Sequence, residues 1–177
     1  MTTDTPPTEI LTARLRLRPA RPGDLPALHA ILGDTRAMRY WSSLPHASLA
    51  ESQAWLDSMI AAPPEESCDF VIEHDARVIG KAGCFRLPEI GFILHPDYWG
   101  KGFAREAVEA VIAHAFRHFP IPSLMADVDP RNAASLGLLG QLGFVETGRA
   151  AHTYRIGEEW CDSIYLTLFR VRSTDVR

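Results

Sequence analysis

The sequence predicts an α/β domain in which a mixed sheet carries helices on both faces. Segments of alternating and of helical hydrophobic periodicity follow one another in the order β-α-α-β-β-β-α-β-α-β-β. The chain has 177 residues, of which 46% are hydrophobic and 23% are charged, so it can bury the core of one globular domain. Only two connections are long enough to be helical crossovers between parallel strands, and most strands are therefore expected to be antiparallel.

The first half of the domain is expected to hold one strand, two helices and three further strands. Residues 1–8 form an expected N-terminal tail, residues 9–171 the domain and residues 172–177 a C-terminal tail. Apolar and basic residues alternate over 11–18, which predicts a half-buried strand. The helices are predicted from Asp24 to Gly33 and over 48–62, where Ser48 and Glu51 form a capping box, and the strands at 69–74, 77–85 and 89–94.

The second half begins with the longest predicted helix, over 102–119. Val108, Val111 and Ala115 fall on one apolar stripe of this helix. The remaining predicted elements are a strand at 124–128, a short helix at 132–142 that ends at Gly143, and two closing strands from Phe144 onward and over 161–171.

Composition excludes several classes of protein. The net charge of −4 and the pI near 6.0 argue against a nucleic-acid-binding surface. No apolar run approaches the ~18 residues of a membrane span, and the N-terminus lacks the features of a signal peptide, so a cytoplasmic protein that binds no membrane is expected. Three cysteines without a CxxC pair indicate neither a disulfide framework nor structural zinc. His114 and His118 lack a third ligand and are expected to be surface residues, so no metal is expected.

Residues 89–107, with the sequence EIGFILHPDYWGKGFAREA, carry the strongest chemical signal. An apolar strand leads through a turn with small residues at 100, 102 and 104 into the long helix, and Lys101 and Arg105 add positive charge. Small residues allow close approach of a ligand, and a helix N-terminus attracts anions, so the segment predicts a phosphate or pyrophosphate cradle. Its spacing matches neither the P-loop nor the dinucleotide fingerprint. A turn without a ligand remains the alternative.

This segment resembles the acetyl-CoA-binding motif of the GNAT acetyltransferase superfamily, Gln/Arg-x-x-Gly-x-Gly/Ala. Gly102 and Ala104 match its last two positions, whereas Trp99 departs from the first. The sequence Asn-Ala-Ala-Ser at 132–135, followed by Leu-Gly-Phe at 142–144, resembles the second family motif. The opening LTARLRLRPARPGDL is similar to the Rim-type branch, which includes acetyltransferases of ribosomal-protein N-termini.

The resemblance covers about residues 9–170 and implies a fold and a co-substrate. The implied fold is a mixed, mostly antiparallel and splayed sheet of six or seven strands with about four helices on both faces. Acetyl-CoA is the implied co-substrate, and no metal is implied. The implied CoA-binding residues are the strand end Phe92, Ile93 and Leu94 for pantetheine, the loop Gly100, Lys101, Gly102, Phe103, Ala104 and Arg105 for the pyrophosphate, and Asn132, which is also a favoured helix N-cap.

Catalytic roles also follow from the resemblance. Ser135 would hydrogen-bond the CoA sulfur or help to protonate the departing thiolate, since the position where many relatives carry a tyrosine holds Leu139. A backbone N–H near Ile93 would stabilise the oxyanion. Asp127 and Glu89 are both candidates for the general base, with a solvated strand-end carboxylate as the alternative for each.

The implied function is transfer of the acetyl group of acetyl-CoA to a primary amine by direct attack in a ternary complex. The acceptor is a small molecule or a peptide, and Trp41 and Tyr154 are expected to contact it. The closing strands could form a homodimer, which no sequence feature demands. Two alternatives stay open: a non-catalytic acyl-CoA-binding or regulatory module with the same fold, and a binder of another nucleotide or phosphate.

Overall fold

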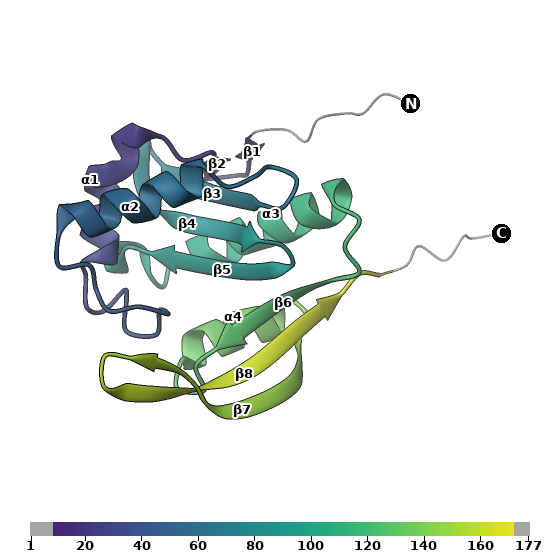
Figure 1. The fold of residues 1–177 in the computed structure, drawn as a ribbon. Coiled ribbons are helices and arrows are strands. Elements are labelled where there is room, and N and C mark those ends of the chain that lie inside the picture. Colours follow the sequence, from purple (N-terminus) through teal and green to yellow (C-terminus); the bar gives the residue numbers. More distant parts are fainter. Residues whose placement is uncertain (1–8, 172–177) are drawn as a thin grey trace.

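The computed structural model describes residues 9–171, which form one mixed sheet with helices on both faces (Figure 1). Eight strands run in the order β1-β2-β3-β4-β5-β6-β8-β7, so the sheet is larger than the expected six or seven strands. The strands are β1 (Ile10–Leu11), β2 (Arg16–Arg18), β3 (Cys68–His74), β4 (Arg77–Arg86), β5 (Glu89–Leu94), β6 (Ser123–Val128), β7 (Val145–Ile156) and β8 (Glu159–Phe169). The helices are α1 (Leu25–Leu32), α2 (Leu49–Ile60), α3 (Phe103–His118) and α4 (Ala133–Gln141).

The additional strand arises because the expected strand over 11–18 is split. Strands β1 and β2 pair with each other in antiparallel fashion, with Ile10 opposite Leu17. The side chain of Thr12 makes the turn between them, because its hydroxyl accepts the Leu15 N–H at 2.9 Å and donates to the Glu106 carboxylate at 2.6 Å. A side chain that bonds its neighbouring backbone interrupts a strand, and this interruption overrides the alternating pattern.

The other elements form close to their predicted bounds. Ser48 caps α2 by accepting the Glu51 N–H at 3.3 Å, as the capping-box pattern predicts. The Glu51 carboxylate accepts the N–H of Ala47 at 2.8 Å, one residue before the expected partner. Helices α1 and α2 cover one face of the sheet, and α3 and α4 lie behind the other face (Figure 1).

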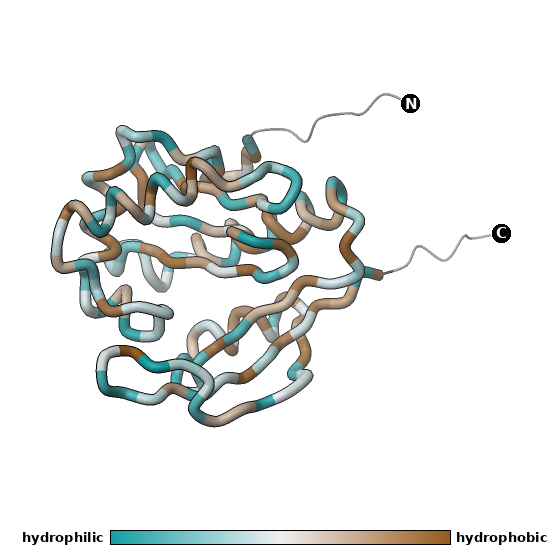
Figure 2. Tube along the Cα trace, in the orientation of Figure 1, coloured by the Kyte–Doolittle hydropathy of each residue, from teal (hydrophilic) through white to brown (hydrophobic). Residues whose placement is uncertain are grey.

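Two apolar clusters follow from this layering. The larger lies under α3 and α4 and includes Val108, Val111, Leu124 and Leu139, whereas the smaller lies under α1 and α2. Because helices cover both faces, consecutive residues of β3 and β4 are buried, and hydrophobic as well as hydrophilic stretches occur along the strands (Figure 2). The larger cluster also corrects one expectation. His114 is buried rather than on the surface, with 7% of its area exposed. Its ring meets the Phe70 ring edge-on, with 5.2 Å between the two ring centres.

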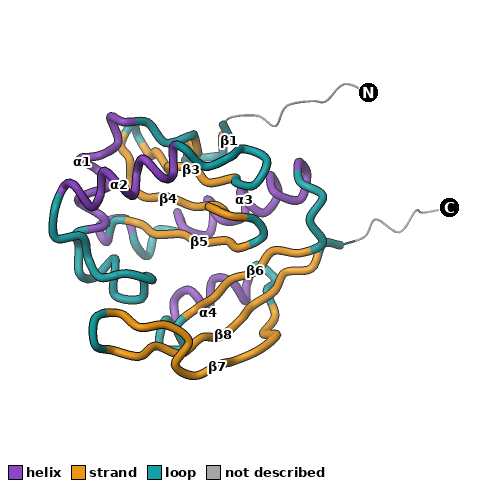
Figure 3. Tube along the Cα trace, in the orientation of Figure 1, coloured by secondary structure: helices purple, strands orange, loops and turns teal. Residues whose placement is uncertain are grey.

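The sheet is splayed at its centre, as expected. Strands β5 and β6 run parallel, and their only register pair joins Glu89 to Met125. The N–H of Met125 donates to the Pro88 carbonyl at 2.9 Å. Beyond this point the two strands diverge, and the sheet divides into β1–β5 and β6–β8–β7 (Figure 3). We call this divergence between β5 and β6 the splay. Among residues 9–171, no helix is both long and apolar enough to cross a membrane.

Candidate active site

The glycine-rich segment forms a loop on the α3 side of the splay. A short 3₁₀ turn over Pro96–Tyr98 follows β5, and α3 then begins with Gly102 as its N-cap. Gly102 has a φ of 79°, in the left-handed region that glycine adopts without strain. Gly100, Lys101 and Gly102 are exposed, whereas Phe103 is buried in the core. As at any helix start, the first N–H groups of α3 have no partner within the helix, and such groups can bind an anion.

Arg14 is a residue of this loop region that the sequence reasoning missed. Its guanidinium donates to the Lys101 carbonyl at 2.9 Å and to the Glu106 carboxylate at 2.7 Å. It also lies 4.4 Å from the centre of the Phe103 ring. These contacts tie the segment before β2 to the loop, over 80 residues later in the chain. In the sequence Arg14 is one of three alternating arginines, which gave no reason to select it.

The main chain of β5 presents hydrogen-bonding groups to the splay. The His95 N–H donates to the Ile79 carbonyl across the β4–β5 ladder at 2.8 Å. Because hydrogen-bonded pairs alternate along an antiparallel ladder, the backbone groups of Ile93 also face β4. Those of Phe92 and Leu94 face the splay, where Trp99 Nε1 donates to the Leu94 carbonyl at 3.0 Å. On this edge of β5, the N–H groups that could bind an oxyanion are thus those of Phe92 and Leu94 rather than that of Ile93.

Helix α4 supplies the remaining residues on this face. Asn132 caps the helix, and its side chain accepts the Ser135 N–H at 3.2 Å. The Ser135 hydroxyl is half-buried and makes no hydrogen bond among the described residues. Leu139 is 1% exposed and belongs to the core, so a tyrosine has no space there. Arg105 of α3 donates to Gln141 of α4 at 3.3 Å, which joins the two helices beside the loop.

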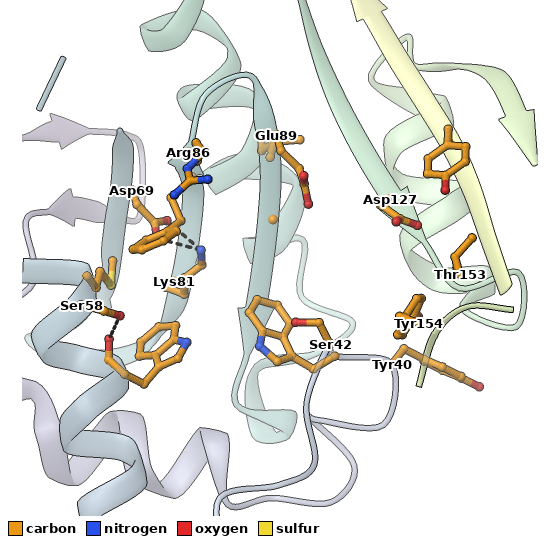
Figure 4. A pocket seen from close by; sticks show the side chains of 18 residues that line it. Tyr40, Ser42, Ser58, Asp69, Lys81, Arg86, Glu89, Asp127, Thr153 and Tyr154 are labelled. Carbon is orange, nitrogen blue, oxygen red and sulfur yellow. Dashed lines mark hydrogen bonds and ion pairs between the residues drawn. The ribbon is translucent and has the colours of Figure 1, made fainter. Parts of the chain in front are cut away.

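The opposite face of the splay holds a cavity of about 790 Å³, which we call the central cavity. Its walls come from the loop before α2, from α2, and from strands on both sides of the splay (Figure 4). Four of the predicted residues line it, namely Trp41, Glu89, Asp127 and Tyr154, whereas Ser135 does not. The glycine-rich loop and α4 thus lie on the face of the sheet opposite to Trp41 and Tyr154, whereas the side chain of Ile93 belongs to the cluster under α1 and α2.

The two carboxylates of the cavity face one another across the splay. Glu89 starts β5, and Asp127 lies on β6, and in Figure 4 both side chains point into the space between the strands. Neither carboxylate makes a hydrogen bond or an ion pair within residues 9–171. Tyr154 stands nearby, and its pKa is raised to about 12, first by burial and then by the charge of Asp129. Its phenol therefore stays protonated at neutral pH and can donate a hydrogen bond.

A buried ion pair in the cavity wall also escaped the sequence reasoning. Lys81 Nζ donates to both carboxylate oxygens of Asp69, at 2.8 and 2.9 Å. The side chains of Lys81 and Asp69 are 4% and 2% exposed, and the ammonium lies 5.8 Å from the centre of the Trp41 ring. The available signal was a lysine in the middle of an otherwise apolar strand, but its partner is apparent only from the β3–β4 register.

Comparison with known proteins matches this architecture to one family. Residues 14–145 fit the family model described as the acetyltransferase (GNAT) domain. The chain belongs to the GNAT acetyltransferase family. As a GNAT enzyme it takes the acetyl group of acetyl-CoA and transfers it to an amine. No group of three or more side chains that could hold a metal ion occurs within residues 9–171.

Individual relatives span nearly the whole chain. The spermidine N(1)-acetyltransferase of Escherichia coli K12 is 28% identical over 165 residues, which cover 88% of this chain and 86% of the relative. The crystal structure of the spermidine N-acetyltransferase of Vibrio cholerae with CoA and spermine superposes with a TM-score of 0.78 at 24% identity, covering 89% and 96% of the two chains. The crystal structure of the Salmonella typhimurium enzyme that modifies the N-terminal serine of ribosomal protein L7/L12 superposes with a TM-score of 0.80 at 17% identity. The superposition covers 90% of this chain and 97% of that one.

Proposed function

We propose that acetyl-CoA and the acceptor amine approach the splay from opposite faces and react there in one ternary complex. The observation that carries this proposal is the position of the splay between the glycine-rich loop on one face and the central cavity on the other. In this arrangement the amine nitrogen attacks the thioester carbonyl directly, without a covalent intermediate on the protein. Holding the two reactants in this geometry lowers the entropic part of the barrier.

On the CoA side, the backbone does most of the binding. The N–H groups of the loop 100–105 and of the first turn of α3 bind the pyrophosphate, and Lys101 adds positive charge. The backbone groups of Phe92 and Leu94 pair with pantetheine as a strand would. The same edge of β5 supplies the N–H that binds the carbonyl oxygen of the thioester as negative charge develops on it. Trp99 replaces the polar residue of the family motif and occupies one of these acceptors, the Leu94 carbonyl.

On the acceptor side, Glu89 and Asp127 hold the ammonium form of the amine, and one of them removes its proton. The neutral nitrogen then forms a bond to the acetyl carbon, the bond from that carbon to the CoA sulfur breaks, and the proton that the nitrogen loses on becoming an amide goes to the thiolate, which leaves as free thiol. Ser135 donates a hydrogen bond to the departing thiolate from the face of α4. Trp41 and Tyr154 enclose the carbon skeleton of the acceptor.

The test follows release of free CoA thiol from acetyl-CoA across a panel of amines: peptides beginning with Ala, Ser or Met, free amino acids, polyamines and aminoglycosides. Amine-dependent release that falls about a hundredfold in Ser135→Ala supports the role of the serine. The matched control is Ser123→Ala, at the start of β6. Tight CoA binding without release for any amine favours the non-catalytic module and contradicts the proposal.

The pH dependence of variants at Glu89 and Asp127 distinguishes the roles of the two carboxylates. Glu89→Gln and Asp127→Asn are compared with Glu65→Gln, which lies outside the cavity. The variant that lacks the base loses about a hundredfold in kcat at neutral pH and recovers at high pH, where the amine is already neutral. A variant that only weakens cation binding raises KM instead. Equal and pH-independent losses in both variants would exclude a general base among them.

Two further predictions concern the cell and the assembly. We propose a cytoplasmic location, which cell fractionation checks. A homodimer through the closing strands would use β7, which lies at the edge of the sheet. Trp160 and Val145 on these strands are exposed, with 54% and 52% of their areas accessible. Sedimentation analysis of the protein distinguishes the dimer from a monomer.

A further inference from the structure

The two ends of the central cavity differ in charge. The end at the splay carries Glu89 and Asp127, both without a partner among the described residues. The end at β3 and β4 carries Asp69, Lys81 and Arg86. Since Asp69 and Lys81 neutralise each other, Arg86 remains as a cation that makes no hydrogen bond or ion pair within residues 9–171. Arg86 and Glu89 are register partners beside the β4–β5 turn, but their side chains diverge: in Figure 4 the guanidinium lies on the side of Asp69, while Glu89 points the other way.

Main chain without side chains lies between Asp69 and the splay. Gly83 of β4 and Gly91 of β5 lie directly opposite each other in the ladder, and both line the cavity. A Cβ atom at Gly83 would lie 2.3 Å from the Cys68 carbonyl oxygen, so no larger residue fits there. The Trp41 ring stands 4.0 Å from the Cβ position of Gly91. An extended molecule can therefore lie across this floor, with its carbon atoms against the indole.

The span between the ends follows from the sheet. Neighbouring strands lie about 5 Å apart, so the positive end, on β4 and β3, lies roughly 5–10 Å from β5. Lys81 has three N–H donors, and Asp69 accepts two of them. In Figure 4 the side chains of Lys81 and Arg86 lie on the same side of the cavity, so the third Lys81 donor and the Arg86 guanidinium can both donate hydrogen bonds at this end, opposite the carboxylates at the other.

We propose that the acceptor of this enzyme is an amine that also carries a carboxylate, separated from it by roughly 5–10 Å. This inference rests on the proposed function and specifies its acceptor. The ammonium lies between Glu89 and Asp127, and the carboxylate binds Arg86 and the third N–H of Lys81. A guanidinium suits a carboxylate because its two parallel N–H groups match the two oxygens. A second ammonium at this place, as in a diamine, meets Arg86 and is repelled.

The experiment compares acceptors that differ only in their distal group. CoA thiol release is measured with 3-aminopropanoate, 4-aminobutanoate and 6-aminohexanoate, with the alkylamines of equal length and with the corresponding diamines. The expected kcat/KM is about tenfold or more higher for an amino acid than for its alkylamine, with an optimum in chain length, because a hydrogen bond to a charged group contributes that much. Diamines that react as well as or better than the amino acids would overturn the proposal.

The variant Arg86→Gln locates the effect. Arg86 is exposed and makes no hydrogen bond among the described residues, so the fold should tolerate its replacement. We expect kcat/KM for the amino acids to fall about tenfold, while that for alkylamines is unchanged and that for diamines rises. The control is Arg77→Gln, an exposed arginine at the other end of β4, which carries the same charge change. Equal effects of Arg86→Gln and Arg77→Gln would also overturn the proposal.

A binding measurement distinguishes failure of this inference from failure of the proposed function. If no amine releases thiol although CoA binds, the proposed function fails. Calorimetry with the CoA-loaded protein then compares 6-aminohexanoate with hexylamine. Tighter binding of the amino acid, lost in Arg86→Gln, still supports the carboxylate subsite. Equal binding of the two compounds contradicts it.

Discussion

Replacing Lys81 by methionine tests the buried ion pair of the cavity wall. The change removes the only hydrogen-bond donor that Asp69 has among the described residues and leaves a carboxylate with 2% of its side-chain area exposed. Breaking a buried pair in this way costs about 3–5 kcal/mol. In a chain of this size one kcal/mol corresponds to about 2–4 °C, so Tm should fall by about 6–20 °C.

The double variant separates the lost pair from a general disturbance of the strand. Combining Lys81→Met with Asp69→Asn removes the unpaired charge, and a neutral amide costs less to bury than a carboxylate. We expect the double variant to be more stable than Lys81→Met alone, although each single change destabilises the protein. Urea and thermal unfolding at neutral pH measure these differences.

Arg77→Met is the control, because it removes a positive charge from an exposed position of the same strand and should change stability by less than about 0.5 kcal/mol. Two results would refute the reasoning. One is a loss below about 1 kcal/mol in Lys81→Met. The other is a double variant whose loss equals the sum of the single losses, which would show that the two charges are not coupled.

Three further outcomes follow from single positions. Gly102→Ala strains the loop, at a φ of 79°, and should weaken acetyl-CoA binding about five- to thirtyfold by calorimetry; unchanged affinity would remove the loop from the CoA site. Burial, followed by the charge of His118, lowers the pKa of His114 to about 4 from 6.5. The unfolded chain therefore binds this proton first, stability falls between about pH 6.5 and 4, and His114→Leu should reduce the fall in acid-unfolding curves. Leu139→Tyr overfills the core, so it should cost about 1–3 kcal/mol in urea unfolding without raising kcat.

The sequence predicted the order of the elements because most of them have strong local signals. The stripe of α3, the cap of α2 and the alternating strands depend on residues close together in the chain. The split between β1 and β2 was missed because the Thr12 side chain bonds Glu106, which lies 94 residues away. His114 was placed on the surface, although it lies three residues after the buried Val111 and so borders the apolar stripe.

The residues of the candidate site likewise include some that local motifs predicted and some that only the fold reveals. Short motifs identified the glycine-rich loop, Asn132 and Ser135. Glu89 and Asp127 were identified because each precedes one of these motifs along the chain. Their roles stay predictions until the variants are measured. Lys81 and Asp69 could not be paired from sequence, since only the register of β3 against β4 brings them together. Arg86 belongs to no motif, and only its position in the wall of the central cavity indicates a role in binding.

The splay interrupts the hydrogen bonding between β5 and β6, but one apolar core continues beneath both strands. The larger apolar cluster includes Ile90 and Leu94 of β5 together with Ala126 and Val128 of β6. We therefore expect the volume of these side chains to set the width of the splay, which in the proposed mechanism is the slot for the thioester. The width of this slot is then a property of the core. Substitutions behind it, which touch neither substrate, would change how long an acyl chain the enzyme accepts.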